Sequence, residues 1–295
     1  MPELPDGAPT LPDRARVVLG TAQFGMPYGR RRGEAALDER AVYEILDAAW
    51  DLGIRAFDTA EAYGRGAELL AGWLRSRGRL ENATVVTKIS AAAVPEPSQV
   101  EAACRRFAGV RLVTVMSHGA LDPLDYSRLK ALAGSFGAEA GQSLYTADEV
   151  RAAAQAGATR VQAPANVLDT RQIEAAHQSA ISIDARSVYL QGLLLDAPEI
   201  AERRARTAGE LALAVRTAAL NCGLAPAAAL LAGVFLHLAP ADRAVVGIDA
   251  VNQLDDVEEA LSASRESVRQ FVNNMSPAKA VRRLDPALLD PRTWS

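Results

Sequence analysis

The chain has 295 residues, of which 49% are hydrophobic and 23% charged, and its formal net charge is −4. Arg30–Arg32 and Arg203–Arg204 are short basic runs that predict solvated surface, so a nucleic-acid partner, which needs a clustered basic face, is not expected. The two cysteines, Cys104 and Cys222, are too few and too isolated for a disulfide framework or a metal cluster. They fit a reducing cytoplasm, and we expect a cytoplasmic protein with no bound metal.

The N-terminal residues 1–13 are rich in proline and acids and lack the apolar core of a signal peptide, so they predict a mobile leader. The remaining residues, 14–295, have the length of one large domain. The longest apolar stretch, 224–238, contains Pro226 and His237 and predicts a buried helix. No membrane-spanning segment and no membrane partner are expected.

Strand-like and helix-like segments alternate along the chain. Strands are expected at 16–19, 55–58, 84–88, 112–117, 138–144, 160–164, 182–188 and 244–247. Helices are expected at 38–52, 68–77, 98–107, 124–133, 147–156, 171–178, 208–221, 226–238 and 254–262, with a further helix at 266–274. Strands alternating with helices imply a parallel sheet, and eight such units close a TIM (β/α)8 barrel in a single α/β domain.

Four polar residues lie at or just after the ends of predicted strands. Asp58, Lys88 and His118 end three apolar runs, and Tyr63 follows Asp58 by five residues. Taken singly, Asp58 could cap a helix, Lys88 could be solvated and His118 could be a satisfied histidine. Together, on the shared carboxyl face of a barrel, they predict an acid–base site. Lys88 would stabilise the Tyr63 phenolate, Asp58 would hold Lys88, and His118 would orient a carbonyl oxygen that is protonated during its reduction.

In these features the sequence resembles the aldo-keto reductase superfamily over nearly its whole length. The residues that carry the resemblance are 20–25, 58–64, 87–88, His118, Gln162, Asn166, 247–249 and 253–254. Residues 186–194 and 289–294 resemble a bacterial branch of the superfamily. The resemblance implies reduction of an aldehyde or ketone, such as a sugar or sugar derivative, with NADPH or NADH and with Tyr63 as proton donor. The partner would be a small carbonyl substrate.

The resemblance also implies a set of cofactor-binding positions. Ser143 and Gln162 match contacts to the nicotinamide carboxamide, and Gln253 and Asp256 match contacts to the adenosine end. The other matching positions are Gly20, Thr21, Ala22, Arg186, Ser187 and Gly247.

Three departures from the family pattern concern the cofactor. Leu144 stands where asparagine is common, and Arg186 stands where many relatives stack a tyrosine on the nicotinamide. Arg186 could instead reach a phosphate or an acidic substrate. The loop 247–253 lacks the usual Lys or Arg for the 2′-phosphate and contains Asp249, so we expect a weak or reversed preference for NADPH over NADH.

Two alternatives remain open from the sequence. One is redox-neutral sugar chemistry, a lyase or epimerase with a retained dinucleotide, and the other is a nucleotide-binding subunit without turnover. The loop 26–30 either lines the substrate side or forms a plain Gly-Pro turn. Loops after the strands are short, so an open pocket is expected. The oligomeric state and the physiological substrate do not follow from these patterns.

Overall fold

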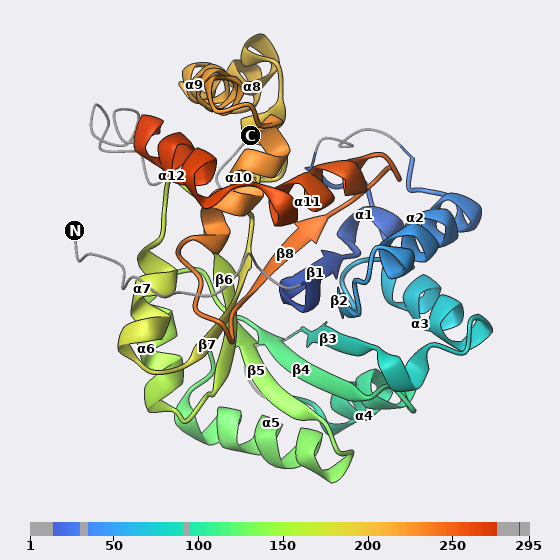
Figure 1. The fold of residues 1–295 in the computed structure, drawn as a ribbon. Helices are drawn as coiled ribbons and strands as arrows, with labels where there is room; N and C mark the ends of the chain where they lie inside the picture. The colour runs from blue at the N-terminus through green and yellow to red at the C-terminus, as the bar shows by residue number, and fades with distance from the viewer. Residues whose placement is uncertain (1–13, 30–34, 91–94, 276–288, 290–295) are drawn as a thin grey trace.

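The computed structural model describes residues 14–29, 35–90, 95–275 and 289. The leader expected at 1–13, the basic run Arg30–Arg32 and the segment 290–294 lie outside these described residues. Within them, eight parallel strands form a closed barrel in chain order, β1 to β8 (Figure 1). The predicted TIM (β/α)8 fold is therefore confirmed.

The element bounds are as follows. The strands are β1 (Val17–Gly20), β2 (Ala56–Asp58), β3 (Thr84–Ile89), β4 (Leu112–His118), β5 (Glu139–Ser143), β6 (Arg160–Pro164), β7 (Ser182–Arg186) and β8 (Arg243–Gly247). The helices are α1 (Ala22–Gly25), α2 (Glu39–Asp51), α3 (Gly66–Ser76), α4 (Pro97–Arg106), α5 (Pro123–Ser135), α6 (Ala147–Gln155), α7 (Arg171–Gln178), α8 (Pro198–Arg204), α9 (Ala208–Asn221), α10 (Pro226–Phe235), α11 (Gln253–Ser262) and α12 (Arg265–Asn274).

Local sequence signals account for several helix starts. The side chains of Asp38 and Asp122 accept hydrogen bonds from backbone N–H groups in the first turns of α2 and α5. Thr146 and Glu149 form a reciprocal capping box at the start of α6. These caps provide partners for N–H groups that a helix leaves without internal hydrogen bonds, and they fix the residue at which each helix begins.

The structure differs from the sequence prediction mainly around β7. The strand expected to reach Val188 ends at Arg186, because Ser187 adopts a left-handed backbone with φ of 62° that cannot continue a strand. Two short helices, α1 and α8, were not predicted. Both are shorter than the two or three turns over which helical periodicity becomes visible in a sequence. α8 packs against α9 at one end of the molecule (Figure 1).

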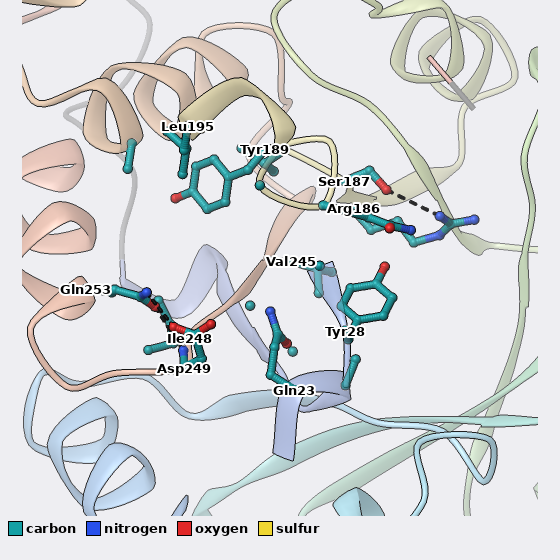
Figure 2. A pocket seen from close by; sticks show the side chains of 18 of the residues that line it. Gln23, Tyr28, Arg186, Ser187, Tyr189, Leu195, Val245, Ile248, Asp249 and Gln253 are labelled. Carbon is teal, nitrogen blue, oxygen red and sulfur yellow. Dashed lines mark hydrogen bonds between the residues drawn. The ribbon is translucent and has the colours of Figure 1, made fainter. Parts of the chain in front are cut away.

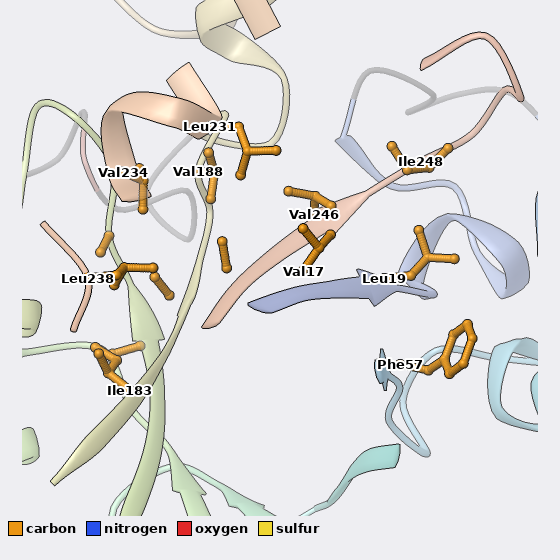
Figure 3. Close-up of a cluster of buried hydrophobic side chains, with 14 of the residues drawn as sticks. Val17, Leu19, Phe57, Ile183, Val188, Leu231, Val234, Leu238, Val246 and Ile248 are labelled. Atoms are coloured by element: carbon orange, nitrogen blue, oxygen red, sulfur yellow. The ribbon is translucent and has the colours of Figure 1, made fainter. Parts of the chain in front are cut away.

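The main hydrophobic core lies between the barrel wall and its helices. Figure 3 shows Val17 and Val246, from the paired strands β1 and β8, near Leu231 and Val234 of α10. Trp73 of α3 is fully buried and meets Phe57 edge-on, with 5.6 Å between the ring centroids. These strands are covered on one side by helices and face the barrel interior on the other, which explains their nearly continuous apolar runs.

The amino-terminal end of the barrel interior is closed by an ionic cluster. The buried Asp184 of β7 accepts hydrogen bonds from Arg243 at 2.8 and 2.6 Å and from Arg160 at 2.9 Å. Burial alone would raise the pKa of Asp184, but the two guanidinium groups outweigh it and the pKa is lowered. A satisfied charge cluster therefore fills the end of the barrel opposite the carboxyl termini of the strands.

No single helix in the described segments has the length and apolar character required to cross a bilayer. Among the described helices, α9 and α10 meet those criteria when taken together, and they are bent by 86° at the break between them.

Candidate active site

Strand register aligns the predicted site residues in two rows. Gly20 of β1 lies between Asp58 of β2 and Gly247 of β8. Ser143 of β5 lies between His118 of β4 and Gln162 of β6. All of these residues lie at or near the carboxyl ends of their strands, where (β/α)8 barrels carry their active sites. Residues distant in sequence thus share one end of the barrel.

Asp58 and Lys88 form a buried ion pair at this end. Lys88 Nζ lies 2.5 and 2.7 Å from the two carboxylate oxygens of Asp58, and the side chains are only 3% (Lys88) and 4% (Asp58) exposed. Burial alone would lower the pKa of Lys88, but the attraction of Asp58, and next of Tyr63, outweighs it, so the pKa is raised. Lys88 therefore stays an ammonium at neutral pH.

Tyr63 brings its hydroxyl to the same ammonium. Lys88 Nζ lies 3.4 Å from the Tyr63 hydroxyl oxygen and 5.2 Å from the centre of its ring. The loop that carries Tyr63 packs directly on α1, where a Cβ on Gly25 would collide with the Tyr63 carbonyl oxygen and one on Gly64 with the Gly25 carbonyl oxygen. Close backbone approach between two glycine-containing segments thus sets the position of the tyrosine.

Gln162 joins this cluster from the opposite wall of the barrel. Its Nε2 donates a hydrogen bond of 2.7 Å to Asp58 Oδ1. Its Oε1 is buried and has no hydrogen-bond partner among the described residues. A buried acceptor without a donor is costly, so this oxygen is suited to receive an N–H group from a bound molecule.

His118 is held at the barrel mouth by a residue that the sequence analysis missed. His118 Nε2 lies 3.0 Å from the hydroxyl oxygen of Tyr145, and the ring of Tyr145 lies 4.6 Å from the guanidinium carbon of Arg186. Arg186 also donates a hydrogen bond of 2.9 Å to the Leu144 carbonyl oxygen. Tyr145 therefore links the predicted catalytic histidine to the arginine at the end of β7. The only signal for it in the sequence is its place two residues after Ser143.

A pocket with a volume of about 160 Å³ opens beside the ion pair. Figure 2 shows Tyr28, Arg186 and Ser187 on one side of this pocket and Asp249 and Gln253 on the other. The lining residues predicted as cofactor or catalytic positions are Gly20, Ala22, Asp58, Tyr63, Arg186, Ser187, Gly247, Gln253 and Asp256. Lining residues that were not predicted include Gln23, Tyr189, Gln191 and Leu195.

The remaining predicted residues lie close to the pocket without being among its described lining residues. Lys88 is buried and contacts Asp58, and Ser143 and Gln162 are buried in the barrel interior. Thr21 is buried, and its backbone N–H donates to the Asp58 carbonyl oxygen at 2.9 Å. His118 is exposed at the end of β4. The structure thus brings Asp58, Tyr63, Lys88 and Gln162 into one contact network.

Tyr28 supports the substrate-side interpretation of the loop 26–30. Its side chain lines the pocket, and burial raises the pKa of the Tyr28 phenol. Tyr63 raises it further, whereas the positive charges of Arg186 and Lys88 act to lower it. These mutual effects indicate that Tyr28 faces the same space as the catalytic candidates. Residue 30 itself is outside the described residues.

The far side of the pocket is acidic. Asp249 Oδ1 accepts a hydrogen bond of 2.5 Å from Gln253 Nε2, and Gln253 Oε1 in turn accepts one of 2.9 Å from the Asp249 backbone N–H. Asp256, which also lines the pocket, has its pKa raised by burial and then by Glu259 and Asp255. Within the described lining, Arg186 is the one positively charged side chain.

The loop after β7 has an unusual backbone. Ser187, Leu190 and Gln191 all have positive φ, of 62°, 47° and 52°, and Gly192 follows at 83°. Left-handed conformations cost non-glycine residues roughly 1–2 kcal/mol each, so surrounding contacts must hold them. Arg204 of α8 supplies such contacts by pairing with Asp196 and donating to the Gln191 carbonyl oxygen at 3.1 Å. Arg204 thereby holds the loop after β7, which forms part of the pocket wall.

No cluster of three or more potential metal-binding side chains occurs in the part of the chain that the structure describes. His177 pairs with Asp242 at 2.7 Å on the helical side of the barrel.

Comparisons with known proteins agree with this fold. The sequence model of the aldo/keto reductase family matches residues 16–111, about a third of the chain, and no curated protein matches the sequence. A solved structure described as an aldo-keto reductase from Pseudomonas aeruginosa is 24% identical with a TM-score of 0.58, covering 88% of this chain and 95% of that one. An aldo-keto reductase from Klebsiella pneumoniae, solved with NADPH, is 17% identical with a TM-score of 0.64, covering 92% and 94%. A thermostable aldo-keto reductase, solved with the inhibitor epalrestat, is 18% identical with a TM-score of 0.65, covering 88% and 94%.

The fold is a (β/α)8 barrel, and the first third of the chain matches the aldo/keto reductase family model. The predicted resemblance to the aldo-keto reductase superfamily is confirmed by the family match over residues 16–111, a range that contains Asp58, Tyr63 and Lys88. Bacterial members among the similar structures are consistent with a bacterial branch.

Proposed function

We propose that the protein is an NAD(P)H-dependent oxidoreductase that reduces an aldehyde or ketone, with Tyr63 as proton donor. The observation that carries the proposal is the position of the Lys88 ammonium, which contacts the Asp58 carboxylate and also lies 3.4 Å from the Tyr63 hydroxyl. A fixed positive charge beside a phenol stabilises the phenolate that remains once the proton has been transferred. Tyr63 lines the pocket, where a carbonyl oxygen can reach it.

Each residue of the cluster has a distinct role in this proposal. Tyr63 gives a proton to the carbonyl oxygen, and Lys88 stabilises the phenolate that remains. Asp58 keeps Lys88 charged and in place, while Gln162 fixes the Asp58 carboxylate. His118, oriented by Tyr145, positions the carbonyl oxygen at the mouth of the barrel.

The residues present also fit a nicotinamide cofactor. The unpartnered Oε1 of Gln162 would accept a hydrogen bond from the carboxamide, and Ser143 lies beside Gln162 in register. Gly20, Ala22, Ser187, Gly247, Gln253 and Asp256 would line the remainder of the cofactor site, and Arg186 lines the same pocket. A bound cofactor would supply the hydride for the reduction. Similar structures solved with NADPH and with NADP support this assignment.

The test is Tyr63→Phe, which removes the hydroxyl and keeps the ring. We expect oxidation of the reduced cofactor, followed at 340 nm with a panel of aldehydes and ketoses, to slow by about 10²–10⁴-fold. Cofactor affinity, titrated by fluorescence, should stay nearly unchanged. Tyr43→Phe is a matched control, since Tyr43 lies on the outer helix α2 and should keep full activity.

A residual rate in Tyr63→Phe within about threefold of the parent would contradict the role of Tyr63. Purified protein that retains a dinucleotide and converts a sugar without net cofactor oxidation would instead support redox-neutral chemistry. Protein that binds the dinucleotide and turns over no compound of the panel would support the non-catalytic alternative.

A further inference from the structure

Arg186 is a half-buried cation whose surroundings leave much of its binding capacity unused. Its guanidinium donates to the Leu144 carbonyl oxygen at 2.9 Å and contacts the Ser187 hydroxyl at 3.4 Å. Neither partner carries a charge, and among the described residues no carboxylate pairs with Arg186. A guanidinium has five N–H donors, so several remain for a ligand.

The contacts of Arg186 fix its plane. The Tyr145 ring lies against the guanidinium, 4.6 Å from its central carbon, and the bond to the Leu144 carbonyl holds one edge. Stacking on an aromatic ring and an anchored edge reduce the conformational freedom that an arginine loses when it binds a ligand. Arg186 is therefore prepared to bind, rather than free to swing into solvent.

Arg186 lies at the same pocket as the proposed reacting groups. Arg186 lines the same pocket as Tyr63 and Tyr28, and Figure 2 shows it on the Tyr28 side, away from Asp249 and Gln253. Its charge acts to lower the pKa of both Tyr28 and Lys88, in agreement with a position near them. Tyr145 connects it further to His118, the residue proposed to orient the carbonyl oxygen.

The charged side chains of the pocket indicate the chemical class of the ligand. Asp58 is neutralised by Lys88, whereas Arg186 forms no ion pair among the described residues, and the lining residue Asp249 lies on the other side of the pocket. A half-buried guanidinium that has no carboxylate partner favours a ligand that carries a carboxylate. Its planar N–H groups can donate two parallel hydrogen bonds to a carboxylate, which a neutral group matches less well.

We propose that Arg186 determines substrate specificity by binding a carboxylate group of the carbonyl substrate, so that the protein prefers acidic aldehydes or ketones. This inference rests on the proposed carbonyl reduction. It assigns Arg186 to the substrate rather than to the dinucleotide.

The experiment compares acids with matched neutral amides. Glyoxylate, succinic semialdehyde and 4-carboxybenzaldehyde place the carboxylate at increasing distances from the carbonyl, and each is paired with its amide. We expect the parent protein to show kcat/KM at least tenfold higher for one or more acids than for the matching amide. Arg186→Gln should lower kcat/KM for that acid by about 10- to 100-fold and change the amide by less than threefold. Arg203→Gln, which removes an exposed arginine of α8, is the control with the same change in net charge and should behave like the parent.

A binding measurement separates this inference from the proposed function. Benzoate and benzamide, which cannot be reduced, are titrated calorimetrically into the protein saturated with oxidised cofactor. We expect benzoate to bind the parent more tightly than benzamide, and Arg186→Gln to remove the difference. Arg186-dependent benzoate binding without reduction of any panel compound would support the anion site and overturn the proposed reduction.

Three results would overturn the role of Arg186. The first is equal kcat/KM of the parent for every acid and its amide, together with equal binding of benzoate and benzamide. The second is an equal loss for acids and amides in Arg186→Gln. The third is a tenfold weaker affinity of Arg186→Gln for the cofactor alone, because that places the guanidinium on the dinucleotide. A preference for glyceraldehyde 3-phosphate over glyceraldehyde that exceeds every carboxylate preference would overturn the choice of carboxylate.

Discussion

Gln162 on β6 donates a hydrogen bond of 2.7 Å to Asp58 on β2, from the opposite side of the closed barrel. The same carboxylate oxygen lies 2.5 Å from Lys88 Nζ. Asp58 is therefore held from two walls at once, and its charge is matched by a single ammonium. This arrangement makes the ion pair important for stability as well as for the proposed chemistry.

Replacing Asp58 by asparagine keeps the shape of the side chain and removes its charge. Lys88 would then be a buried ammonium without a counter-ion, and we expect a loss of about 3–5 kcal/mol in the free energy of unfolding. Urea denaturation at pH 7 measures this loss. The double variant Asp58→Asn/Lys88→Met is the control and should lose less than the sum of the two single variants, because no unpaired charge remains. A loss below about 1 kcal/mol in Asp58→Asn would show that water reaches the pair.

The ionic cluster around Asp184, at the other end of the barrel, predicts that the stability of the protein depends on pH. The folded-state pKa of Asp184 lies below its ordinary value of 3.8, so its ionised form contributes stability above that pH. This contribution should be lost as the pH falls through the lowered folded-state pKa. We expect Asp184→Asn to lose about 2–3 kcal/mol at pH 7, since Arg160 and Arg243 keep some solvent contact. The difference between the parent and this variant should shrink at pH 3. A constant difference in urea denaturation at the two pH values would contradict the linkage.

Replacing Gly25 by alanine tests whether close backbone packing positions Tyr63. A Cβ in Gly25→Ala would collide with the Tyr63 carbonyl oxygen and must displace one of the two segments. We expect a loss of about 1–3 kcal/mol in stability and at least a tenfold lower kcat, because the hydroxyl moves away from Lys88. Gly134→Ala is the matched control. Gly134 lies within α5, and a Cβ added there would meet no heavy atom within 4 Å outside its own helix turn, so the variant should leave kcat unchanged and stabilise the protein slightly.

The Asp249–Gln253 pair predicts the cofactor preference. With an acid and an amide where a 2′-phosphate would need a cation, we expect NADH and NADPH to bind with affinities within about tenfold of each other. Asp249→Lys should shift the ratio toward NADPH by about 10- to 100-fold. Asp249→Asn retains an acceptor for Gln253 and removes the charge, so its shift should be smaller. Fluorescence titrations of both reduced cofactors at one ionic strength measure these ratios. Parent protein that binds NADPH a hundredfold more tightly would show that another cation grips the phosphate.

Much of the architecture follows from the sequence because its signals are local. Val85 to Lys88 reads as a buried strand from its own apolar residues, and the alternation of such runs with helical segments determines a parallel barrel. The shared carboxyl face then places Asp58, Lys88 and His118 at one end before any contact is known. For the same reason the short helices α1 and α8, which lack several turns of periodicity, escaped prediction.

Tertiary structure alone decided which side chains touch. The bond from Gln162 to Asp58 joins residues 104 positions apart, and no local pattern specifies it. Tyr145 gains its place between His118 and Arg186 from its contacts with β4 and β7, and its own neighbours in sequence do not reveal it. The sequence determined the order of the elements because backbone preferences and burial patterns act over a few residues. The contacts across the barrel depend on closure and register, which arise only when all eight strands are in place.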